Sequence, residues 1–303
     1  MQLLTIINNS HKEYVLDKVK DIITYLKDKE IFLHYKIQED NKLEVIEIYN
    51  ESSDKEEDKK IVQYYIACIL YSIAVEDFLT KDINKHLNEM YNFLNYKDIE
   101  MIKEIVNKVL KEEIAVDETI IFCMNRKNEA IQKIVNCMDE FNELNVKGFL
   151  DFRFKEISRD IYIMIEKIVE KYMVEKEYNE FISLLRYFVE VQDCKIERVD
   201  LFISDYPGEY ILKDDFGNDL MDSFFNDLCE NKTVGDISKD DLLISGLITI
   251  CPRKIVIHSV EKCKNKELIS TISSVFKERV EYCDKEVECI DLRDHISHHP
   301  YNE

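Results

Sequence analysis

The segment YNEFISLLRYFVEVQ (Tyr178–Gln192) is followed closely by RVDLFIS (Arg198–Ser204). In the first segment apolar side chains recur every three or four residues, which predicts one apolar face of a helix. The side chains on that face are Tyr178, Phe181, Ile182, Leu185, Phe188 and Val189. In the second segment apolar and polar residues alternate, which predicts a strand. The change of period near Asp193 therefore predicts the boundary between a helical region and a sheet-containing region.

Upstream of this boundary, residues 61–191 keep a helical period and contain no proline. We assign residues 56–192 to a helical block. The longest apolar run in the block is YYIACILYSIAV (Tyr64–Val75). It is shorter than the ~20 residues that a membrane-spanning helix needs. We therefore expect a buried core helix and no membrane span.

The N-terminal segment shows shorter periods. LLTIINN (Leu3–Asn9) predicts a strand, and an amphipathic helix follows it. The next two runs, IFLHYKI and KLEVIEIY, alternate in twos and predict a hairpin. Residues 1–55 are therefore predicted to form a small β-α-β-β unit.

Downstream of Asp193, predicted strands and helices follow one another. KDDLLISGLITI predicts a helix that Pro252 ends, KIVIH a buried strand, KELISTISSVF a helix and RVEYC a further strand. A strand-helix-strand sequence of this length predicts a parallel pair of strands. Residues 193–303 are therefore a mixed α/β part with a polar tail, and the fold class of the whole chain is α+β.

Charge and cysteine usage restrict the partners and the compartment. The formal net charge is −21, which would repel the phosphates of DNA or RNA, so we expect no nucleic-acid partner. The cysteines are odd in number, nine, and the N-terminus has no signal-peptide pattern. These features favour the reducing cytoplasm over a disulfide framework.

Gly148 is one of only five glycines and lies between two helical patterns. Glycine adopts positive φ without a Cβ clash, so we expect Gly148 to form a C-terminal helix cap or a tight turn between helices. Arg153 follows it closely in GFLDFRFKEISRDI. Arg153 and Arg186 could form a small anion pocket, because guanidinium groups match carboxylates and phosphates. The alternative is that both arginines make ion pairs between helices.

The order and spacing of several segments resemble the YtxC-like family of sporulation proteins. The segments are GFLDFRFKEISRDI, EKYMVEKEYNEFISLLRYFVEVQ, VDLFISDYPGEYILKDDFGNDL and DDLLISGLITICPRKIVIH. The resemblance covers about residues 126–258, and the N-terminal part resembles the family less clearly. It implies a cytoplasmic protein connected with sporulation. It implies no activity and no functional residues.

Motifs for several common chemistries are missing from the sequence. It contains no G-x-x-x-x-G-K-[ST], no G-x-G-x-x-G and no G-x-S-x-G. We therefore assign no catalytic residues and no cofactor. His258 is the last residue of the predicted strand KIVIH and is a third binding candidate, although such a histidine is more often a hydrogen-bonded edge residue. Cys251 and Cys263 lie on either side of this strand.

A cysteine and histidine cluster near the C-terminus does not have the spacing of a zinc site. Its members are Cys283, Cys289, His295, His298 and His299. Structural zinc sites place ligands two to four residues apart, whereas the first three of these residues are six apart. We therefore assign no metal site.

Two functional hypotheses remain. The first is a non-enzymatic interaction or regulatory factor that binds another sporulation protein, and the missing motifs favour it. The alternative is a small-molecule- or metal-dependent enzyme. Its site would lie between the helical block and the C-terminal sheet, near Arg153, Arg186 and His258.

Overall fold

The structure is a computed structural model that describes residues 1–39, 43–51, 56–111, 117–139, 142–204, 209–221 and 238–283. The predicted polar tail, residues 291–303, lies outside the described residues. The chain forms two compact units, unit 1 (Met1–Val174) and unit 2 (Glu175–Glu303). Both helices and mixed β-sheets are present, so the predicted α+β class is confirmed.

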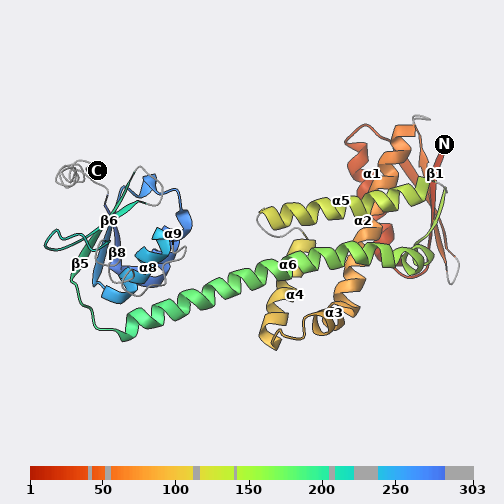
Figure 1. Ribbon diagram of the computed structural model, residues 1–303. Helices are drawn as coiled ribbons and strands as arrows, with labels where there is room; N and C mark the ends of the chain where they lie inside the picture. The colour runs from red at the N-terminus through yellow and green to blue at the C-terminus, as the bar shows by residue number, and fades with distance from the viewer. Residues whose placement is uncertain are drawn as a thin grey trace, which may run out of the picture. The chain divides into compact units, whose positions relative to one another are not determined.

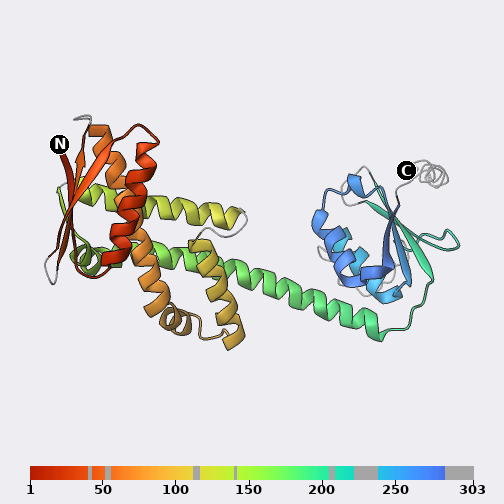
Figure 2. The ribbon, with the colours of Figure 1, turned by 180° about the vertical axis from the view of Figure 1, so that it is seen from behind.

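Unit 1 combines a four-stranded sheet with a set of helices (Figures 1 and 2). Its elements are β1 (Gln2–Asn8), α1 (Lys12–Lys27), β2 (Leu33–Glu39), β3 (Glu44–Asn50), α2 (Glu56–Lys81), α3 (Ile83–Met90), α4 (Tyr96–Leu110), α5 (Glu118–Asp139), β4 (Glu143–Asn145) and the first part of α6 (Val146–Val191). The strand order is β2-β3-β1-β4, and only β4 runs parallel to its neighbour. The predicted β-α-β-β order of the N-terminal segment is confirmed.

One hydrophobic core extends through unit 1. Leu4 and Ile6 of β1, Leu70 of α2 and Ile161 and Ile165 of α6 all belong to it. The predicted segment 1–55 and most of the predicted helical block therefore share a core. The last turns of α6 belong instead to unit 2.

Helix α2 is long and apolar enough to cross a membrane by length and composition alone. In the most apolar window of this helix, 61% is buried inside the protein. Ile66, Leu70 and Ala74 are among its core residues. This burial is typical of a core helix, as the sequence predicted.

Gly148 does not form the predicted cap or turn. Residues 143–145 pair with β1 as strand β4, so the chain enters α6 directly from the sheet. Gly148 lies in the first turn of α6, and its backbone N–H donates to Asn145 Oδ1 at 2.8 Å. Among the described glycines only Gly217 has a positive φ, so the prediction for Gly148 was wrong.

Unit 2 is built on a second four-stranded sheet with strand order β6-β5-β7-β8. Its elements are the end of α6, β5 (Arg198–Ile203), β6 (Tyr210–Asp214), α8 (Lys239–Ile250), β7 (Lys254–His258), the 3-10 turn η1 (Val260–Lys262), α9 (Lys266–Phe276), the 3-10 turn η2 (Lys277–Arg279) and β8 (Val280–Cys283). Strands β7 and β8 are parallel and α9 connects them, which confirms the predicted strand-helix-strand unit.

The two faces of this sheet differ. Leu201 and Ile257 point to the face where α8 and α9 pack, and they belong to the core of unit 2 with Leu247 and Ile272. Side chains alternate along a strand, so Asp200 and the other residues one position away lie on the opposite face. Figure 1 shows α8 and α9 together on one side of the strands.

The start of α4 generates the first prediction. Asn95 Oδ1 accepts from the backbone N–H of Asp98, the carboxylate of Asp98 accepts from the Asn95 N–H, and Tyr172 Oη of α6 donates to Asp98 at 2.7 Å. Asn95→Ala removes this cap, so it should lower the free energy of unfolding at α4 by about 1 kcal/mol. Hydrogen exchange of the α4 amides measures this change. The control is Asn92→Ala, an exposed asparagine just before the cap, and equal effects of the two variants would contradict the prediction.

Candidate functional site

His258 ends strand β7 and is only 4% exposed. Its Nε2 lies 2.7 Å from Asp200 Oδ1 of β5, and its ring stacks on Phe202 with a centroid distance of 4.3 Å. Strands β5 and β7 are parallel neighbours in which Phe202 is paired with His258. The register of the sheet therefore brings these three side chains together.

Asp200 also forms an ion pair with the guanidinium group of Arg198. Arg198 donates from Nη2 to Oδ1 at 2.6 Å and from Nε to Oδ2 at 2.9 Å. Burial by itself would raise the pKa of Asp200, but the hydrogen bonds from His258 and Arg198 outweigh it and the pKa is lowered. An ionised carboxylate only accepts hydrogen bonds, so His258 Nε2 carries the proton in this pair. The geometry fixes the orientation of the histidine.

Arg186 lies on the other side of the sheet. It belongs to α6, and its Nη2 donates to the backbone carbonyl of Ser274 in the last turn of α9 at 2.8 Å. Its Nε is buried and has no hydrogen-bond partner among the described residues. His258 lies on the face that α9 does not cover, so Arg186 and His258 do not form one site.

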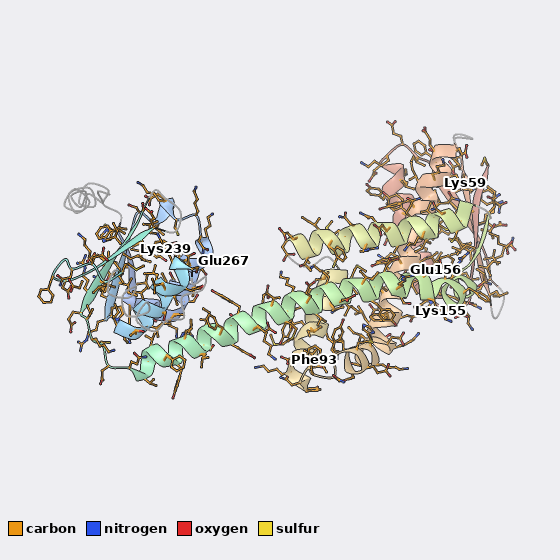
Figure 3. The ribbon with its side chains drawn as sticks, in the orientation of Figure 1. Lys59, Phe93, Lys155, Glu156, Lys239 and Glu267 are labelled. Carbon is orange, nitrogen blue, oxygen red and sulfur yellow. The ribbon has the colours of Figure 1, made fainter. Side chains whose placement is uncertain are left out.

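Arg153 belongs to unit 1. Its Nη1 lies 3.1 Å from Glu156 Oε1, one turn along the same helix, and both side chains are exposed. Figure 3 shows the position of Glu156 on α6. Exposed pairs of this kind contribute little to stability. The contact matches the ion-pair alternative for this arginine, except that it lies within one helix.

The cysteines beside β7 do not converge on His258. Cys251 Sγ is 3.3 Å from Arg279 Nη1, and Cys263 Sγ lies 3.2 Å from the carbonyl of Asn265. Among the described residues no group of three or more His, Cys, Asp or Glu side chains could hold a metal ion. Cys289, His295, His298 and His299 lie outside the described residues.

The second notable feature of unit 2 is a groove of about 510 Å³ between α6, α8 and α9, here named the α6–α8–α9 groove. Its apolar lining residues are Phe181, Leu185, Ile244, Ile248 and Leu268. Three carboxylates, Asp240, Asp241 and Glu267, also line it. The groove is therefore both apolar and acidic.

The apolar surface continues along α6 beyond the groove. Ile182 and Val189 are buried in the core, but other apolar side chains of the same helix are exposed. Phe181 is 52% exposed, Leu184 51%, Tyr187 59% and Phe188 42%. The sequence placed Phe181 and Phe188 on one face with Ile182 and Val189, whereas the core covers only part of that face. Contiguous exposed apolar residues of this kind mark interaction sites.

The sequence indicates His258 as a candidate site residue but does not indicate the groove. The groove joins residues that are far apart in the chain, from Phe181 to Thr271. One available signal was the width of the apolar pattern in α6. Leu184 and Tyr187 lie outside the predicted face, so the apolar surface is wider than one core-facing stripe.

A family model for the YtxC-like family matches residues 64–281. The chain belongs to the YtxC-like family. The uncharacterized protein YtxC of Bacillus subtilis (strain 168) is 22% identical over 215 residues, which cover 69% of this chain and 74% of that protein. No solved structure matches the chain. The matched range includes the α6–α8–α9 groove and the Arg198–Asp200–His258 network.

The network generates the second prediction. Asp200→Asn leaves the buried His258 and the guanidinium of Arg198 without their carboxylate, and should lower the free energy of unfolding by about 2 kcal/mol at neutral pH. The pKa of Asp200 is lower in the folded than in the unfolded chain. Its stabilising contribution is therefore present above the ordinary carboxyl pKa of about 3.9 and is lost as the pH falls through the lowered folded value.

The difference between wild type and Asp200→Asn should accordingly shrink as the pH is lowered through the acid range. Urea denaturation at several pH values measures it. Asp193→Asn, an exposed aspartate outside the network, is the control and should change stability by less than about 0.5 kcal/mol. A difference between wild type and Asp200→Asn that does not depend on pH would contradict the assignment of an ionised Asp200.

Proposed function

We propose that this protein is a non-enzymatic interaction or regulatory factor that acts in the cytoplasm during sporulation. In this proposal it binds another sporulation protein through the α6–α8–α9 groove of unit 2. The observation that carries the proposal is the exposed apolar surface of α6 beside a groove with an apolar floor. A folded protein rarely leaves such a surface exposed unless a partner covers it.

Two further features support an interaction role. The sequence lacks the glycine-rich loops that bind nucleotide phosphates. Arg186, one of the two arginines that could have formed an anion pocket, instead donates to the backbone carbonyl of Ser274 in α9. The sporulation context comes from the family resemblance.

A second candidate function is small-molecule binding or catalysis, and one specific observation favours it. His258 lies at the carboxyl end of a parallel strand beside Asp200, and ligand sites in α/β sheets lie at such strand ends. However, Asp200 orients His258, and Arg198 neutralises the charge of the same carboxylate. The groove therefore remains the favoured site.

A complementation experiment provides the third prediction. In the source organism, deletion of the gene should lower the yield of heat-resistant spores, and the wild-type gene should restore it. The double variant Phe181→Asp/Leu184→Asp should fail to restore it, because two charges would prevent apolar docking on α6. Both side chains are about half exposed, so the variant should fold, which circular dichroism checks.

Two variants complete the experiment. Phe216→Asp changes a phenylalanine of unit 2 that is 90% exposed and outside the groove, and it should restore spores fully. His258→Gln should also restore spores if the protein acts by interaction. Normal spore yield in the deletion strain would contradict the sporulation role, and loss of function in a folded His258→Gln variant alone would favour the second candidate.

A further inference from the structure

We infer that the α6–α8–α9 groove binds a basic amphipathic helix of its partner, with apolar side chains along the groove and lysines or arginines at one end. This inference rests on the proposed function and specifies the chemistry of the partner. The inference is based on the shape of the groove, on the position of its carboxylates and on the absence of basic side chains among its described lining residues.

The apolar part of the groove has the pattern that a helix needs. Ile244 and Ile248 of α8 are one turn apart, while Leu185 comes from α6 and Leu268 from α9. Leu268 belongs to the core of unit 2, and the other three side chains are partly buried against it. The floor of the groove is therefore packed on the core. An amphipathic helix places side chains from positions i, i+3 or i+4, and i+7 into such a floor. Exposed Phe181 extends the contact surface at the edge.

The carboxylates gather at one end. Asp240 and Asp241 lie in the first turn of α8 and Glu267 in the first turn of α9. Asn265 Nδ2, at the start of α9, donates to Asp240 Oδ2 at 2.6 Å, so the two helix starts meet. Figure 3 labels Lys239 and Glu267 at these helix starts. Ile244 and Ile248 follow along α8, away from that end.

Among the residues that the structure describes, no lysine, arginine or histidine forms an ion pair with these carboxylates. Asp240 accepts hydrogen bonds from Tyr210 Oη and Asn265 Nδ2, and Asp241 accepts one from Ser238 Oγ. All three donors are neutral. Within the part of the chain that the structure describes, Glu267 makes no ion pair. Three carboxylates make this end of the groove acidic, and the positive ends of the helix dipoles stabilise their ionised forms.

Charge complementarity selects the occupant. The described lining residues include three acids and no lysine, arginine or histidine, and Lys239 and Lys266 flank the groove without lining it. A basic segment gains from these charges, whereas an acidic segment is repelled. A second copy of this chain carries the same net charge of −21, which disfavours self-association at this surface.

The fourth prediction uses two synthetic peptides that form amphipathic helices. Both carry leucines at positions i, i+3 and i+7; one has a cluster of lysines at one end and the other has glutamates at the same positions. Fluorescence anisotropy with the full chain should show a Kd on the order of micromolar for the lysine peptide. The glutamate peptide should bind at least about tenfold more weakly, and added salt should reduce the difference.

Variants locate the binding site. Glu267→Gln should weaken binding of the lysine peptide by about twofold to fivefold, and Glu267→Lys by about tenfold. Glu278→Lys reverses an exposed charge of η2 outside the groove and is the matched control. Phe181→Asp should abolish binding, and Phe216→Asp should leave it unchanged.

Three results would overturn the inference. They are equal binding of the two peptides, equal effects of Glu267→Lys and Glu278→Lys, and a dimer in sedimentation equilibrium that Phe181→Asp dissociates and that excludes the peptide. The last result would make a second copy the occupant.

Spore assays separate this inference from the proposed function. If Phe181→Asp/Leu184→Asp prevents sporulation while Glu267→Lys supports it fully and binds the lysine peptide normally, the interaction role stands and the basic partner is excluded. If Glu267→Lys weakens peptide binding and Phe181→Asp abolishes it, but both variants form spores normally, the partner chemistry stands and the sporulation role at this groove fails.

Discussion

The packing of helix α6 is the interaction on which both units depend. Ile161, Ile165 and Ile168 complete the core of unit 1, while Ile182 and Val189 of the same helix belong to the core of unit 2. After Gly148 the helix contains neither glycine nor proline, so no residue interrupts its hydrogen bonding. A single element thus has two sets of tertiary contacts, which stabilise it far more than helix propensity does.

This double role leaves part of α6 uncovered. In unit 2 the core takes Ile182 and Val189, but the apolar surface of the helix is wider than that stripe. The neighbouring first turns of α8 and α9 carry acids, which their helix dipoles favour. The groove therefore combines exposed apolar side chains with carboxylates because α6, α8 and α9 meet at this point.

Local patterns in the sequence predicted most elements, and nonlocal pairing accounts for the differences. KELISTISSVF is α9 and KIVIH is β7, because strong periodicity and nearby breakers define them. The interpretation of Gly148 failed because residues 143–145 pair with β1. Strand β1 is far from these residues in the sequence, and local sequence patterns do not identify such a pairing. His258 was predicted as a binding residue only because it ends the strand KIVIH. Its link to Asp200 depends on the register between β5 and β7, which the sequence does not specify.

The position of β4 has a consequence for biosynthesis. Strand β1 leaves the ribosome before residues 143–145, yet one of its edges pairs with these later residues. Until then the nascent β1 has unpaired backbone groups that favour association with other chains. Translation must therefore proceed through α5 and into α6 before unit 1 can close its sheet, so slow elongation over this interval extends the time during which the newborn polypeptide needs chaperone protection.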